Sequence, residues 1–245
     1  MNRNLFIKRI YLEKEKIKEW DTYPFSIEAV KNLDSISFHA PVTFLIGENG
    51  VGKSTLIEAL AVLLELNAEG GSQNFRFSTQ NTTSNLSDYL GMETYNRPKT
   101  KFFLRMESFY NFSTEVERLV KEDGFSELRE VYGGNLHACS HGESSLKIVQ
   151  NRFVDHGLYI LDEPEAALSI QSQMKLLCLI DDLVKKGSQF IIATHSPILI
   201  RYRNGEILDL ENHFEKVEYK NTAIYQMYKM YLDIPEKMQQ KLFDE

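Results

Sequence analysis

The sequence has little cysteine, no long hydrophobic run and no excess of positive charge. Cys139 and Cys178 are its only cysteines, which is too few for a disulfide framework and typical of a reducing compartment. No window approaches the roughly 18 uninterrupted apolar residues of a membrane span, and charges interrupt any signal-like N-terminal stretch. We therefore expect a soluble, cytoplasmic protein with no membrane insertion.

The charge balance is acidic, with 28 Lys and Arg against 35 Asp and Glu, a net charge of −7. This argues against a generally basic protein that binds nucleic acid without regard to sequence, although a local basic patch stays open. The 245 residues are 42% hydrophobic, enough for a large core. No repeat, heptad run or clear linker divides them, so we predict one domain, 1–245, with a loop-rich and helical lobe at 67–139.

The stretch from Val42 to Thr55, VTFLIGENGVGKST, organises the rest of the chain. Its apolar start, Val42–Ile46, predicts a strand buried on both faces and therefore central in a parallel sheet. A phosphate-loop pattern follows, in which glycines let successive N–H groups point at phosphate oxygens and a helix begins near Ser54. Lys53 would supply positive charge to the phosphates and Ser54 a ligand to Mg²⁺. A chance glycine turn is the alternative.

Paired carboxylates follow a second apolar strand, Leu158–Leu161, at the edge where open α/β sheets place their sites. Adjacent strand residues point in opposite directions, so Asp162 and Glu163 should differ in role. Asp162 would hold Mg²⁺, and Glu163 would act on the attacking water. Alternatively, the two acids are an ordinary charge pair before Pro164.

Two further segments carry candidate residues. The strand Phe190–Ala193 delivers His195 to the same edge, where its imidazole would contact the γ-phosphate or serve a structural role. Ser140, at a helix start with Gly142 close behind, offers an anion site or an ordinary cap.

The remaining pattern predicts a parallel α/β core. Asn67–Pro98 is polar and expected to be a surface loop, Cys178 to pack in the core, and Thr222–Leu242 to be helical and packed. The other predicted strands are Leu5–Leu12, Phe25–Ile27, Ile36–Phe38, Phe102–Met106 and a hairpin of Glu206–Leu210 with Phe214–Tyr219. The other predicted helices are Ser113–Lys121, Glu143–Phe153 and Ser169–Lys186.

The motif order GENGVGKST, SHGES, LDEPEAALS and THS resembles that of the ATP-binding-cassette (ABC) ATPases. It is most similar to predicted bacterial ATPases related to the heads of chromosome-maintenance and DNA-repair proteins. The resemblance implies a P-loop fold with a mainly parallel sheet, flanking helices and an antiparallel N-terminal β portion. It also implies ATP and Mg²⁺ as cofactors, and a head-to-tail homodimer.

The resemblance assigns roles residue by residue. Lys53, Glu163 and His195 would be catalytic, and Ser54, Asp162 and Glu107 would serve the metal. Ala166–Ser169 stands in the D-loop position. The residues expected to bind nucleotide are Gly47, Glu48, Asn49, Gly50, Val51, Gly52, Lys53, Ser54 and Thr55, together with Ser140, His141, Gly142 and Glu143 of the signature segment.

The chain also departs from the family pattern. His141 and Glu143 replace the usual glycine and glutamine of the signature, and the glutamine loop falls on Glu107 or Gln80. The segment 54–139 is too short for a long coiled-coil arm. Three functions stay open for such an ATPase. It could act in DNA repair or defence with a separate effector such as a nuclease, it could energise a membrane transporter, or it could be a nucleotide-gated interaction module without turnover.

Overall fold

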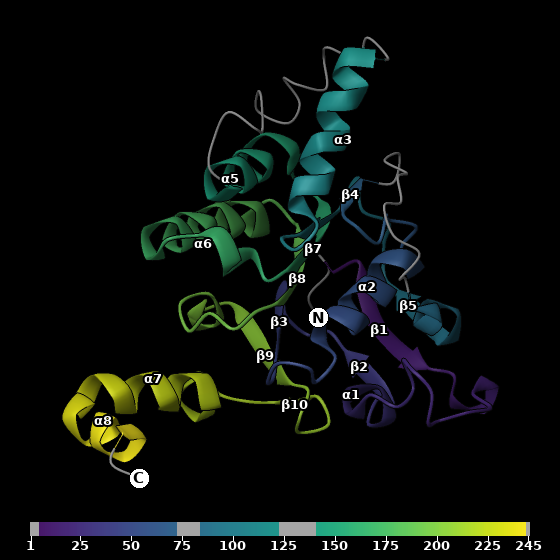
Figure 1. Cartoon of the computed structure of the whole chain (residues 1–245). Helices are drawn as coiled ribbons and strands as arrows, with labels where there is room; N and C mark the ends of the chain where they lie inside the picture. Colours follow the sequence, from purple (N-terminus) through teal and green to yellow (C-terminus); the bar gives the residue numbers. More distant parts are fainter. Residues whose placement is uncertain (1–4, 73–83, 123–140, 244–245) are drawn as a thin grey trace.

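The strands form two sheets, and helices flank them (Figure 1). The computed structural model describes residues 5–72, 84–122 and 141–243. The strands are β1 (Ile7–Leu12), β2 (Ser35–Ser37), β3 (Val42–Ile46), β4 (Gly71–Ser72), β5 (Leu90–Thr94), β6 (Thr100–Arg105), β7 (Gly157–Asp162), β8 (Gln189–Ala193), β9 (Gly205–Asp209) and β10 (Glu215–Lys216). The helices are α1 (Glu28–Lys31), α2 (Lys53–Leu63), α3 (Phe109–Glu122), α5 (His141–Arg152), α6 (Ile170–Lys185), α7 (Ala223–Asp233) and α8 (Pro235–Phe243).

The larger sheet has the strand order β10-β9-β3-β8-β7-β6-β4. Its five inner strands are parallel, and β10 and β4 pair antiparallel at the two edges. All five residues of β3 are buried between β9 and β8, which confirms the predicted central parallel strand. Because parallel strands end on one edge, the residues that follow β3, β6, β7 and β8 gather there.

Side chains alternate between the two faces of this sheet, and each face has its own core. Phe44 packs in the core under α3, α5 and α6, whereas its neighbour Leu45 packs in the core shared with α2 and the small sheet. That second sheet has the order β2-β1-β5 and is antiparallel throughout, as predicted for the N-terminal portion. Figure 1 shows the two sets of helices on opposite sides of the sheet.

Two local predictions were wrong near the N-terminal sheet. Phe25–Ile27 is not a strand, because the chain turns here: the Ser26 amide donates to the Thr22 carbonyl and the Ile27 amide to the Pro24 carbonyl. The expected surface loop Asn67–Pro98 contains β4 and β5, and β5 pairs with β1. Gly91 in β5 lies under the Tyr11 ring, where a Cβ would meet the ring at 2.2 Å.

The C-terminal segment is helical as predicted, but it is mostly exposed rather than packed: only Ile224 among the residues of α7 and α8 packs, partly buried, against a core. Neither α7 nor α8 contains a buried residue, and Leu232 and Phe243 are 73% and 79% exposed. Cys178 on α6 is also exposed, against the prediction of core packing. Among the helices of the described ranges, none has the length and apolarity needed to cross a membrane.

Candidate active site

The phosphate-loop sequence forms a tight turn between β3 and α2. Gly52 immediately precedes α2 with φ of 111°, and a Cβ there would lie 2.6 Å from the Ile27 side chain. Both the backbone angle and the close approach therefore require glycine. The first N–H groups of α2 face the turn, as the sequence predicts for an anion site.

The Lys53 side chain lies inside this turn and is 4% exposed. Its ammonium donates hydrogen bonds to the carbonyls of Gly47 and Glu48, each at 2.9 Å. Burial lowers the pKa of Lys53, while Glu163 and Asp162 act against that shift. The neighbouring carboxylates compensate the charge of this buried cation only in part, and a bound phosphate would supply the remaining negative charge.

Ser54 and Asp162 bring a hydroxyl and a carboxylate together from two elements. The Ser54 hydroxyl donates to Oδ1 of Asp162 at 3.3 Å, and Asp162 ends β7 with 4% of its side chain exposed. Burial raises the pKa of the Asp162 carboxyl to about 6, although Arg105 opposes the rise. Two adjacent oxygen donors fit Mg²⁺, which prefers oxygen ligands and completes its shell with water and phosphate. The described residues hold no cluster of three or more His, Cys, Asp or Glu that would form an all-protein metal cage.

Glu163 and His195 meet at the same edge. Glu163 adopts a left-handed conformation with φ of 48°, and its Oε1 lies 3.7 Å from Nε2 of His195. Burial, followed by the charge of Lys53, lowers the pKa of His195, so the imidazole is neutral at pH 7. Its buried Nε2 makes no hydrogen bond within the described ranges, which leaves it available to a ligand.

Glu165 supports His195 and was not predicted. Its Oε1 accepts a hydrogen bond from the His195 backbone N–H at 2.6 Å, and burial raises the pKa of its carboxyl. The signal in the sequence was the second glutamate of LDEPE, but nothing in the pattern paired it with a segment 30 residues away.

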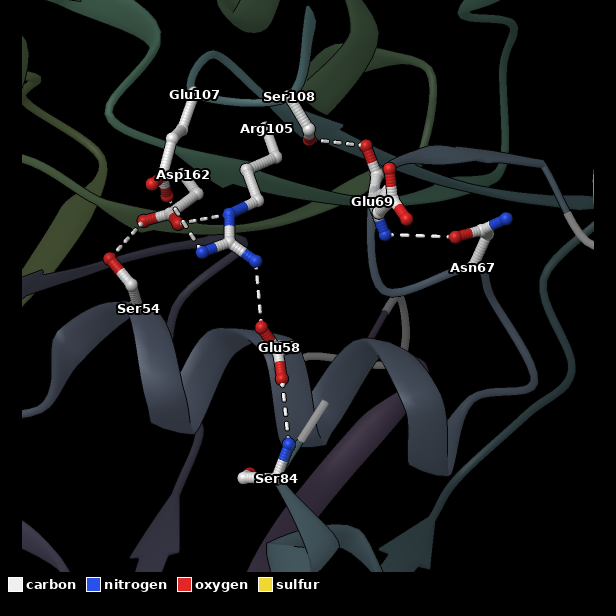
Figure 2. Close-up of polar contacts among 9 residues, drawn as sticks. All are labelled: Ser54, Glu58, Asn67, Glu69, Ser84, Arg105, Glu107, Ser108 and Asp162. Carbon is white, nitrogen blue, oxygen red and sulfur yellow. Dashed lines mark hydrogen bonds and ion pairs between the residues drawn. The ribbon is translucent and has the colours of Figure 1, made fainter. Parts of the chain in front are cut away.

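Arg105, at the end of β6, also escaped the sequence analysis. Its guanidinium contacts Glu58, Glu107 and Asp162 (Figure 2). Glu107, one of the two residues predicted for the glutamine-loop position, follows β6 at the predicted edge but is 79% exposed and paired with Arg105. Its role toward the metal stays a prediction.

The signature candidates lie at the start of α5. His141 is its first residue, followed by Gly142 and Glu143, whereas Ser140 and Gln80 lie outside the described residues. Gly142 packs so closely on the D-loop candidate that a Cβ would meet the Ala167 carbonyl oxygen at 2.2 Å. Ser169 caps α6 by accepting a hydrogen bond from the Ser172 amide. The start of the signature segment and the D-loop candidate are therefore in contact within one chain.

A pocket of about 160 Å³ adjoins the phosphate loop on the side of α7. Glu48, Asn49 and His195 line it together with Ile224 and Met227 of α7. Helix α7 therefore lies next to the phosphate loop.

Comparisons with known proteins show similarity to ATPase domains. Residues 42–123 match the family model described as "AAA domain, putative AbiEii toxin, Type IV TA system", and residues 145–200 match "AAA ATPase domain". The cytochrome c biogenesis ATP-binding export protein CcmA of Rhodopseudomonas palustris is 28% identical over 74% of this chain and 90% of its own length. In both matched segments the chain is thus similar to AAA- and ABC-type ATPase domains.

Other similar proteins are ATP-binding proteins or subunits by their names. The zinc import ATP-binding protein ZnuC of Vibrio vulnificus is 27% identical over 75% of this chain and 69% of its own length. A solved ATP-binding subunit of an ABC transporter overlaps 83% of this chain and 92% of its own, at 16% identity and a TM-score of 0.43. The chain is thus an ATP-binding enzyme that hydrolyses ATP, as the motifs predicted.

Proposed function

We propose that this single-domain ATPase works in the cytoplasm as a Mg²⁺-dependent, head-to-tail homodimer whose ATP cycle switches a partner or a nucleic-acid process. The observation that carries the proposal is the convergence of Lys53, Ser54, Asp162, Glu163 and His195 at the ends of β3, β7 and β8.

Each group has a distinct task in hydrolysis. Lys53 and the α2 N-terminus bind the phosphates, and Ser54 and Asp162 hold the metal, which supplies charge neutralisation when bound. Glu163 orients the attacking water and accepts its proton, and neutral His195 donates a hydrogen bond from its imidazole to a γ-phosphate oxygen.

A dimer is proposed because each ABC-type ATP site would combine the phosphate loop of one subunit with the signature segment of the other. The signature segment Ser140–Glu143 is proposed to cap ATP bound by the other subunit. The tight packing of Gly142 on Ala167 supports a rigid unit of signature and D-loop. In an isologous dimer both composite sites would then form together.

Glu163→Gln tests this proposal. The change removes the base but leaves the phosphate and metal groups, so turnover should vanish while ATP affinity is kept. With Mg²⁺ and ATP the variant should elute as a dimer on size exclusion, and with ADP as a monomer. Lys53→Ala is the control that should lose both binding and the dimer. Normal hydrolysis by Glu163→Gln would refute the assignment.

A second function is the energising subunit of a transporter, since the named relatives are ATP-binding proteins of zinc import and of cytochrome c biogenesis export. The two functions predict different partners. A neighbouring gene for a membrane permease favours transport, and one for a nuclease favours DNA repair or defence. Stimulation of ATP hydrolysis by added DNA would also favour the latter, although the net charge of −7 does not.

A further inference from the structure

Arg105 is the centre of a polar network beside the Asp162 carboxylate. Nη1 lies 2.7 Å from Oε2 of Glu58, Nη2 lies 2.8 Å from Glu107, and Nε lies 3.7 Å from Oδ2 of Asp162 (Figure 2). The Arg105 side chain is 18% exposed, so this cation is held mostly away from water.

The two oxygens of Asp162 have different neighbours. Oδ1 accepts the hydrogen bond of Ser54 on the side of the phosphate loop, and Oδ2 faces Arg105 on the other side. Arg105 and Asp162 are register partners on the adjacent parallel strands β6 and β7. The backbone pairing therefore fixes where the guanidinium lies relative to the carboxylate.

Glu58 fixes the other end of the guanidinium. It lies on α2, one turn after Ser54, and its side chain is 12% exposed. Its second oxygen accepts the Ser84 backbone N–H at 3.2 Å. Arg105 is thus held between a strand and a helix, and its orientation does not depend on exposed Glu107.

We propose that Arg105 is a positioning residue for Mg²⁺: the positive charge of its guanidinium, 3.7 Å from Oδ2 of Asp162, attracts that oxygen and so keeps Oδ1 beside the Ser54 hydroxyl, where the metal would bind. This inference rests on the proposed metal role of Asp162. Groups that orient a metal ligand typically change metal affinity or activity by about 10- to 100-fold when removed.

A purely structural role would have a different signature. As a cross-link between β6 and α2, Arg105 would affect stability but not the dependence of nucleotide binding on Mg²⁺. Lys101 provides a matched control because it lies on the same strand, is 19% exposed, and bonds to the Leu64 carbonyl at the end of α2.

The experiment measures the affinity of a fluorescent ADP analogue across a Mg²⁺ titration and in EDTA. Arg105→Met should raise the Mg²⁺ concentration that half-maximally strengthens binding by about 10-fold or more. Its affinity in EDTA should stay within about twofold of wild type, because the phosphate-loop groups are untouched. Lys101→Met should retain the wild-type Mg²⁺ requirement whatever its melting temperature.

Arg105→Lys is a second test variant, to be used if Arg105→Met does not fold. One ammonium keeps the charge and can pair with Glu58, but it cannot also reach Asp162 as the branched guanidinium does. It should therefore raise the Mg²⁺ requirement too. If either variant folds and needs no more Mg²⁺ than wild type for nucleotide binding, the proposal is overturned.

Asp162→Asn separates this inference from the proposed function. If it abolishes the effect of Mg²⁺ while the Arg105 variants keep the wild-type requirement, only the positioning role fails. If Asp162→Asn itself retains a wild-type response to Mg²⁺, the metal role of Asp162 fails and the inference fails with it.

Discussion

Asp162→Asn should stabilise the nucleotide-free protein at neutral pH while it destroys hydrolysis. The Asp162 side chain is 4% exposed, and burial raises the pKa of its carboxyl from 3.8 to about 6 even with Arg105 beside it. Asparagine has nearly the same shape and carries no charge to desolvate. The substitution therefore removes an unfavourable buried charge whose proposed function is to bind the metal.

The size and sign of this effect follow from proton linkage. The native state holds the Asp162 proton more tightly than the unfolded chain, so wild-type stability falls as pH rises between about 4 and 6 and levels off above. At pH 7.5 the ionised carboxylate costs the native state about 3 kcal/mol of unfolding free energy, and at pH 5 about half of that. The asparagine variant should gain these amounts.

Urea unfolding followed by circular dichroism, in EDTA without nucleotide, measures the gain at both pH values. Asp155→Asn is the contrasting control, because Asp155 is a surface aspartate whose hydrogen bond with Lys99 lowers its pKa. That variant should lose a little stability at neutral pH. A less stable Asp162→Asn at pH 7.5, or an equal gain at both pH values, would refute the reasoning.

Two further substitutions probe the site. His195→Ala should lower the hydrolysis rate about 100-fold, equivalent to about 3 kcal/mol of lost transition-state stabilisation, with ADP affinity unchanged in a binding assay; equal losses of ADP and ATP binding would instead indicate a structural histidine. Gly142→Ala should lower the unfolding free energy by about 1–3 kcal/mol in urea, because its Cβ would overlap the Ala167 carbonyl oxygen at 2.2 Å. Wild-type stability would show that the start of α5 shifts without strain.

The parallel core was predictable because buried parallel strands are continuous apolar runs. β3, β7 and β8 each showed such a run, and each ends at a candidate residue, so strand prediction and site prediction supported one another. The hairpin of β9 and β10 was equally visible from the turn at Glu211 and Asn212.

Tertiary contacts of polar residues were not predictable in this way. Arg105 and Glu58 are 47 positions apart, and no periodicity links a charged strand end to a helix interior. β5 was missed because LGMET has few of the β-branched residues that mark a strand and forms only by pairing with β1.

Helical periodicity does not by itself determine which residues of a helix are buried. Ile170 and Met174 follow the apolar spacing of α6 but are 62% and 53% exposed. Both line a pocket of about 790 Å³ together with Tyr225 and Leu232 of α7. The spacing identifies an apolar face of a helix, but whether the same chain covers that face depends on its neighbours.

Three polar groups at this sheet edge are buried in a way that a bound substrate would relieve. Lys53 is a buried cation with a lowered pKa, Asp162 a buried acid with a raised one, and His195 has a buried nitrogen without a hydrogen bond in the described ranges. Bound phosphate would compensate the first and third, and a divalent cation the second. Any one of these features occurs in structural sites, but their combination at one sheet edge fits the simultaneous binding of an anion and a metal. The instability of the free site therefore supports the same Mg²⁺-nucleotide function as its motifs.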